Sequence, residues 1–177
     1  MNKLLVFLVI SLVIISFSPS YANENTWGTQ FPEGLITTAN ESYDLEQLES
    51  KKLIGLYFTA SWCRGCQAFT PNLIPFRNTH KDVFEVVMVN FDHSKKDMMA
   101  YMTEHSMPWP AIDYGTSAIE TLKKKYDVSE IPALIILSAD GRVITKDGYL
   151  QVDIDAATCM TSWLKLAERK PITSKIK

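Results

Sequence analysis

The sequence predicts an α/β fold in which helices flank both faces of a central mixed β-sheet. Residues 53–59 and 84–90 are apolar almost throughout, as strands buried on both faces should be. A helical pattern lies between them, and this order of strand, helix and strand requires a crossover and a parallel pair. Two later strands, 133–137 and 143–146, flank a turn that contains Asp140 and Gly141, which predicts antiparallel pairing. The sheet is therefore expected to be mixed.

The first 22 residues have the three parts of a secretory signal. Lys3 supplies the charge, residues 4–17 form an apolar run, and Ser20 and Ala22 offer small side chains for cleavage after Ala22. The run is shorter than the roughly 20 residues needed to span a bilayer, which favours a cleaved signal. A segment retained as a membrane anchor is the alternative. We expect an exported protein of the bacterial periplasm.

Length and composition predict one globular domain, because 177 residues with 46% hydrophobic content suffice for a core. We assign residues 35–170 to this domain, 23–34 to a flexible leader and 171–177 to a C-terminal tail. Trp27 and Phe31 of the leader are candidates for docking on the domain. Lys and Arg number 18 against 20 Asp and Glu, and loss of the signal removes one more lysine. This mildly acidic balance argues against nucleic acid or an anionic membrane as partner, since both favour a basic surface. We expect a monomer.

The remaining elements follow from periodicity and end signals. Residues 35–38 are a short strand candidate, and residues 40–50 suit a short surface helix. Longer helices are expected over residues 95–105, 117–126 and 154–170. The side chains expected to face the core from these three helices are Met98, Met99, Met102, Ile119, Leu122, Ala157, Met160, Trp163, Leu164 and Ala167.

Between the first buried strand and the next helix lies the segment Trp62-Cys63-Arg64-Gly65-Cys66. Two cysteines three positions apart at a helix start can close a disulfide or open to two thiols. The unsatisfied N–H groups of a helix N-terminus favour thiolate over thiol, so Cys63 is the candidate nucleophile and Cys66 the second catalytic cysteine. The positive charge of Arg64 is expected to lower the pKa of Cys63 further, and Gly65 leaves the sulfurs uncovered.

The helix that follows the cysteine pair contains two prolines. Residues 63–80 have helical spacing of apolar side chains, but Pro71 and Pro75 are expected to kink or break the helix.

The order of elements resembles the thioredoxin fold, together with residues at related offsets: Trp62, Cys63, Cys66, Pro71 and the pair Ile131-Pro132. Within that family the chain is similar to the tryparedoxin and nucleoredoxin branch. The segments that carry this likeness are Tyr57-Phe58-x-Ala60-Ser61-Trp62-Cys63, Phe69-Thr70-Pro71-x-Leu73 and Met107-Pro108-Trp109. Two features depart from the branch. Arg64-Gly65 stands where Pro-Pro or Pro-Cys is usual. Those relatives act in the cytosol or nucleus, whereas this chain is expected to be exported.

The resemblance implies a thiol–disulfide oxidoreductase, of the protein-disulfide reductase type, with the Cys63–Cys66 couple as its redox group and no further cofactor. In the family the proline is cis, so Pro132 is expected to be cis and to lie beside Cys63. Trp62 and Ile131 would complete the substrate-binding surface. The expected partners are protein or small-molecule disulfides and, given export, a membrane protein that donates electrons through thiols. The direction in the cell, reduction or oxidation, stays open.

Many thioredoxins carry a buried aspartate six residues before the first cysteine, where it handles protons for the second. Here Tyr57 stands at that position. Proton transfer at Cys66 must then use water, Glu130 beside the proline, or another group.

A binding module is the competing hypothesis, in which the scaffold holds a thiol partner or a metal on Cys63 and Cys66 without turnover. Copper carriers of this fold space their cysteines one residue wider and add a histidine, and this chain has neither feature. Cys159 is interpreted as a small buried hydrophobe, with a redox role as the alternative. Trp109 either walls the site or packs in the core. No metal site is expected, because ligand spacing is lacking among His80, His93 and His105.

Overall fold

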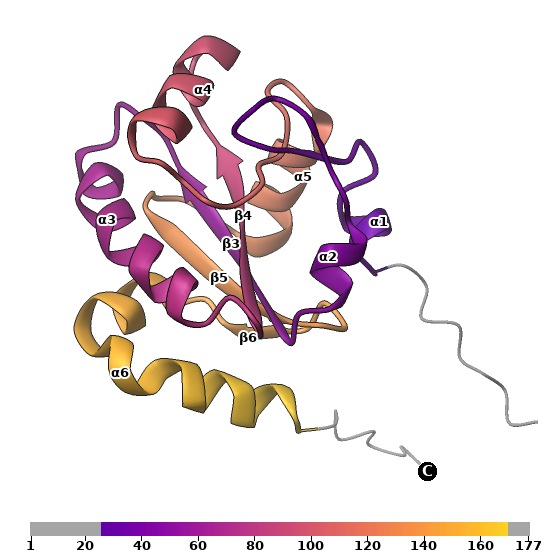
Figure 1. The fold of residues 1–177 in the computed structure, drawn as a ribbon, viewed down its shortest axis with the longest axis vertical. Helices are drawn as coiled ribbons and strands as arrows, with labels where there is room; N and C mark the ends of the chain where they lie inside the picture. The colour runs from indigo at the N-terminus through magenta and orange to yellow at the C-terminus, as the bar shows by residue number, and fades with distance from the viewer. Residues whose placement is uncertain (1–25, 170–177) are drawn as a thin grey trace, which may run out of the picture.

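The main sheet has four strands in the order β4-β3-β5-β6 in the computed structural model, which describes residues 26–169 (Figure 1). The strands are β3 (Leu53–Thr59), β4 (Phe84–Asn90), β5 (Ala133–Ser138) and β6 (Val143–Thr145). β3 pairs in parallel with β4 and antiparallel with β5, and β5 pairs antiparallel with β6. The predicted mixed sheet is confirmed. The expected signal, its cleavage position and the tail 171–177 lie outside the described residues.

Helices cover both faces of this sheet, as predicted (Figure 1). Successive strand residues point to opposite faces, so Tyr57 of β3 faces one core and Phe58 the other. α3, α4 and α6 pack on the Tyr57 side, and α1, α2 and α5 on the Phe58 side. The helices are α1 (Thr26–Gln30), α2 (Glu46–Glu49), α3 (Arg64–Thr79), α4 (Lys95–Glu104), α5 (Ser117–Tyr126) and α6 (Gly148–Ala167).

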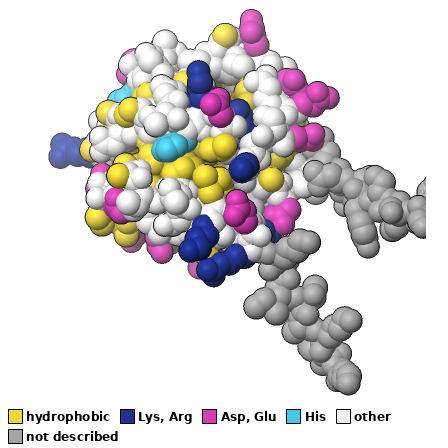
Figure 2. Space-filling model, turned by 60° about the horizontal axis from the view of Figure 1, so that its bottom comes forward, with side chains coloured by type: hydrophobic (Ala, Val, Ile, Leu, Met, Phe, Trp, Pro, Cys, Tyr) yellow, Lys and Arg dark blue, Asp and Glu magenta, His cyan; other side chains and the backbone are white. Residues whose placement is uncertain are grey.

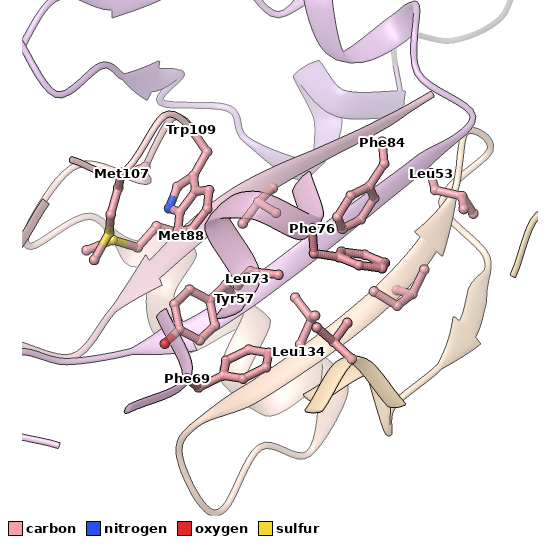
Figure 3. Packing of buried hydrophobic residues seen from close by; sticks show 14 of the residues in the cluster. Leu53, Tyr57, Phe69, Leu73, Phe76, Phe84, Met88, Met107, Trp109 and Leu134 are labelled. Carbon is pink, nitrogen blue, oxygen red and sulfur yellow. The ribbon is translucent and has the colours of Figure 1, made fainter. Parts of the chain in front are cut away.

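Aromatic rings pack against one another in the core beneath α3 (Figure 3). Phe69 and Trp109 both meet the ring of Tyr57 edge-on, with centroids 5.8 and 6.2 Å away. Such pairs add about 0.5–1.5 kcal/mol beyond the area they bury. Trp109 is 1% exposed and lies beside Met107 in Figure 3, so it packs in the core and does not wall an exposed site.

The segment predicted as a flexible leader is folded in its described part. Residues Thr26–Gln30 form α1, and the side chains of Trp27 and Phe31 are each 1% exposed in the core that α5 and α2 share. The expectation of a flexible segment over residues 23–34 is therefore wrong from residue 26 onward, whereas the docking of Trp27 and Phe31 on the domain is confirmed. Burial of two large aromatic side chains outweighs the polar, aperiodic local sequence.

The predicted helix over residues 40–50 is mostly replaced by a strand and a turn. β1 (Leu35–Ile36) pairs antiparallel with β2 (Ser42–Tyr43), and Asn40 takes a left-handed conformation, with φ 60°, in the turn between them. Within this range only Glu46–Glu49 is helical, and Leu48 is the buried residue of this short helix.

The two prolines do not break α3, contrary to one of the alternatives expected. The helix runs from Arg64 to Thr79 and contains both Pro71 and Pro75. Both prolines are exposed, and their spacing of four residues puts them on one helix face. A proline removes one backbone N–H donor, and on the exposed face of a helix water can replace the partner that the carbonyl loses.

The last helix begins earlier than predicted, at Gly148 instead of Ile154. Asp155 has non-helical angles, φ −146° and ψ 63°, and joins two helical pieces across a kink. Ile154 is 80% exposed and Ala157 is also exposed, so the inward placement of Ala157 is wrong. The stripe that α6 does bury includes Cys159, Met160 and Trp163.

The inward faces of the other two long helices agree with the prediction. Met98 and Met102 of α4 are fully buried, whereas Met99 is partly buried. Ile119 and Leu122 of α5 lie in the opposite core.

Figure 2 brings forward the end of the molecule at which β3 and β4 begin, where hydrophobic side chains gather among charges of both signs.

Candidate active site

The cysteine pair lies where β3 ends and α3 begins. Cys63 has extended backbone angles, φ −86° and ψ 108°, and is the N-cap of α3. Its Sγ accepts a hydrogen bond from the backbone N–H of Cys66 at 3.1 Å. The two residues form a disulfide, with their Cα atoms 5.2 Å apart. An N-cap normally supplies an oxygen acceptor, and here a sulfur takes that place.

The two sulfurs differ in how far solvent reaches them. Cys63 is 8% exposed and Cys66 is fully buried, in a small cluster with Ala60. Partly buried side chains of Phe91 and Ile131 pack against this cluster. A molecule that approaches the disulfide therefore meets Cys63 first.

The proline loop reaches the cysteine pair from β5. The Ile131-Pro132 peptide bond is cis, as the resemblance implied. The carbonyl oxygen of Ile131 lies 3.6 Å from Cys63 Sγ, which confirms the expected proximity. Gly65 lies under the proline ring, because a β-carbon built on Gly65 would come 3.1 Å from Pro132 Cδ. The close approach of this ring is therefore a physical reason for a glycine at position 65.

Trp62 is the large exposed side chain of the site, with 53% of its surface accessible. Its Nε1–H donates to the carbonyl oxygen of Phe91 at 3.2 Å, and its ring stacks on the imidazole of His93. Arg64 and Glu130 are both exposed. The structure thus brings Trp62, the cysteines, Gly65 and the cis proline loop together, and places Trp109 elsewhere.

A carboxylate that the sequence reasoning missed holds the segment before Cys63. Asp92 is 7% exposed and accepts from the backbone N–H of Ser61 at 2.8 Å and from its hydroxyl at 2.7 Å. The side-chain amide of Asn90 donates to the other carboxylate oxygen at 2.6 Å. β3 and β4 are parallel with Thr59 opposite Asn90, so the residues that follow each strand meet at one edge. In the sequence, the polar residues that follow the predicted strand 84–90 were the signal that could have indicated Asp92 as part of the site.

Behind Cys66 lies a buried hydroxyl network, also unforeseen. The Tyr57 hydroxyl lies 2.9 Å from Thr70 Oγ1 and donates to the backbone carbonyl of Cys66 at 3.2 Å. The Tyr101 hydroxyl joins Thr70 at 2.8 Å and Thr59 at 3.2 Å. Burial raises the pKa of Tyr57 above its ordinary value, so this phenol stays protonated and donates hydrogen bonds at neutral pH. The network fixes the backbone of Cys66.

Two further features bear on the predicted chemistry. A surface cavity of about 330 Å³ adjoins Pro132 and is lined in part by Glu130, Lys146 and Tyr149. Cys159 is buried in α6, as expected, and burial raises the pKa of its thiol to about 11.

Among residues 26–169, no three metal-binding side chains come together. In the same range, no helix combines the length and apolar character that a bilayer crossing requires.

Comparisons with known proteins agree with this geometry. A family model described as thioredoxin-like matches residues 51–143. Nucleoredoxin of Xenopus laevis is 34% identical over 145 residues, which cover 72% of this chain and 34% of that protein. The chain thus spans about a third of the length of that curated relative. A thioredoxin structure from Wuchereria bancrofti has 40% identity and a TM-score of 0.65, covering 74% of this chain and 93% of its own. Tryparedoxin I from Leishmania major has 34% identity and a TM-score of 0.66, covering 73% and 90%.

Proposed function

Because this chain belongs to the thioredoxin-like family, in its tryparedoxin and nucleoredoxin branch, we propose that it is an exported thiol–disulfide oxidoreductase that reduces disulfides. One observation carries the proposal. Cys63, the more exposed cysteine, caps α3 and accepts the Cys66 N–H at its sulfur. In the reduced protein this hydrogen bond favours a thiolate, which is the attacking form in disulfide exchange.

The proposed reaction has two exchange steps. The Cys63 thiolate attacks one sulfur of the substrate disulfide, and the other substrate sulfur leaves as a thiolate and takes up a proton. Cys66 then loses its proton and attacks Cys63 Sγ, which breaks the mixed disulfide and releases the second substrate thiol. Two electrons pass from the dithiol to the substrate. The Cys63–Cys66 disulfide of the structure is the oxidised end state of this cycle.

Substrate binding is proposed for the surface around Cys63. The Ile131 carbonyl oxygen lies beside Cys63 Sγ. Trp62 is the residue before Cys63, and its ring is exposed. Pro132 borders the cavity of about 330 Å³, which offers space for the groups that flank the substrate sulfur. We assign substrate contact to Trp62, Ile131 and Pro132 on this basis.

Reduction outside the cytoplasm needs an electron supply. We propose a membrane protein with exchangeable thiols as the donor, which returns the oxidised pair to the dithiol by the same two exchange steps in reverse. The proposed export follows from the signal-like residues 1–22. Mass measurement of the protein from the producing cells tests it. Export predicts a chain that begins at Asn23, and a full-length chain that stays in the cytoplasm would contradict it.

An insulin-reduction assay with dithiothreitol tests the activity. The wild-type protein should accelerate insulin precipitation, Cys63→Ser should not, and the matched control Cys159→Ser should act like wild type. The enzyme proposal fails if wild type gives no acceleration. Stoichiometric metal on such an inactive protein would favour the binding module instead.

A further inference from the structure

The indole of Trp62 is held in place by contacts from one short loop. Trp62 is 53% exposed, whereas the other three tryptophans are each 1% exposed. A half-exposed ring loses conformational freedom when a substrate binds unless contacts already fix it. Two contacts do so here. The indole N–H donates to the Phe91 carbonyl oxygen at 3.2 Å, and the imidazole of His93 lies nearly parallel to the indole in an offset stack, with centroids 5.9 Å apart and planes 10° apart.

The backbone that carries His93 is itself anchored. The Tyr114 hydroxyl donates to the His93 carbonyl oxygen at 2.7 Å. The preceding residue, Asp92, donates its N–H to the Asn90 side chain at 2.8 Å and also holds Ser61. The following residue, Ser94, is the N-cap of α4. The backbone of His93 is therefore anchored on both sides. From this fixed position its imidazole stacks on the exposed Trp62 indole and can define the orientation of that ring.

We propose that His93 is a positioning residue that holds the Trp62 indole in the orientation which polypeptide disulfide substrates contact. The inference rests on the proposed reductase function and specifies its substrate side. His93 acts through Trp62 and has no part in the exchange chemistry at Cys63. A polypeptide that reaches Cys63 covers the neighbouring Trp62 ring, so a pre-oriented ring lowers the ordering cost of binding.

Steady-state kinetics with insulin as the substrate test this role. An aromatic pair contributes enough to change an equilibrium about two- to tenfold, so His93→Ala should raise KM by about that factor. The kcat should stay within about twofold, because the cysteines are untouched. His93→Phe keeps a flat ring and should restore KM. The matched control is His80→Ala, which removes a histidine that contacts Phe76 at the far end of α3 and should leave KM unchanged.

Fluorescence quenching by acrylamide reads the stack directly, because Trp62 is the accessible tryptophan. His93→Ala should steepen the quenching slope, and His93→Phe and His80→Ala should match wild type. In a Trp62→Ala background, His93→Ala should raise KM no further. Circular dichroism and thermal unfolding verify that each variant folds.

Two results would overturn the proposal: a His93→Ala protein with wild-type KM and quenching, or a KM increase that persists without Trp62. A wild-type protein that fails to reduce insulin would refute the proposed function, and the quenching series would still report whether His93 shields Trp62.

Discussion

A β-carbon on Gly65 would lie 3.1 Å from Cδ of Pro132, although the two residues are far apart in the chain. The first turn of α3 can approach the cis proline loop this closely because residue 65 has no side chain. The same approach brings the Ile131 carbonyl oxygen to 3.6 Å from Cys63 Sγ. Gly65 is thus part of the contact that assembles the site from two distant segments.

Gly65→Ala should lower the unfolding free energy of the oxidised protein by about 1 kcal/mol. Alanine gains up to about 1 kcal/mol over glycine in a helix, whereas overpacking costs about 1–3 kcal/mol. Gly148→Ala is the contrasting variant, because its β-carbon would meet the backbone oxygen of Leu134 at 2.5 Å, and we expect a loss of about 3 kcal/mol. Urea titrations measure both. A stabilised Gly65→Ala protein would contradict the close contact.

Asp92→Ala should cost about 2–3 kcal/mol of stability. The change leaves the Ser61 N–H and the Asn90 amide without their acceptor near a buried site, and each unsatisfied donor costs about 1–3 kcal/mol. Ser61→Ala removes only one hydroxyl from the same arrangement and should cost about 1 kcal/mol. Equal losses in the two variants would show that the carboxylate does not anchor this segment.

Stability should fall above pH 10, in part through Tyr57. Burial raises the pKa of Tyr57, so the folded protein keeps this proton at pH values where the unfolded chain releases it. The contribution is complete below pH 10 and declines above it by about 1.4 kcal/mol per pH unit. Tyr57→Phe should flatten that decline and cost about 1–2 kcal/mol at neutral pH through its lost hydrogen bonds.

Urea titrations between pH 8 and 11 measure this dependence. Burial also raises the pKa of Tyr43, to about 12, and this second tyrosine gives the same background in both proteins. Identical pH slopes for wild type and Tyr57→Phe would contradict the assignment to Tyr57.

Arg64→Ala should make the Cys63–Cys66 couple more reducing. A nearby positive charge stabilises the Cys63 thiolate and with it the reduced form, so removing the charge lowers the potential. Arg64 is exposed, and an effect of about 0.5–1 kcal/mol corresponds to about 10–20 mV. Equilibration with glutathione measures the potential, and Lys165→Ala is the charge control on α6. A rise in potential would refute the role given to Arg64.

The central strands, the mixed sheet and the cysteine site could be predicted because their signals are local. Residues 53–59 and 84–90 are continuous apolar runs, and the cysteine pair falls at a strand-to-helix junction whose context is a few residues long. The cis proline could be placed beside Cys63 only through the family resemblance, because nothing local to Ile131-Pro132 identifies its partner.

The features that were missed depend on contacts between distant residues. Asp92 contacts Ser61 only because β3 and β4 align in parallel with Thr59 opposite Asn90. Docking of Trp27 was one of the outcomes that the sequence left open, and only the residues of the later core that bury this side chain decide it. Pro71 and Pro75 are tolerated in α3 because both lie on its exposed face, which the pattern of apolar residues alone did not settle.

Trapping of mixed disulfides tests the central claim, that Cys63 attacks and Cys66 resolves. Reduced Cys66→Ser, Cys63→Ser and wild-type proteins are mixed with insulin, quenched with acid and analysed by mass spectrometry. The account predicts a stable insulin adduct on Cys63 in the Cys66→Ser protein, with none on Cys63→Ser and only a transient one on wild type. An adduct that forms as fast on Cys66 of the Cys63→Ser protein would contradict it.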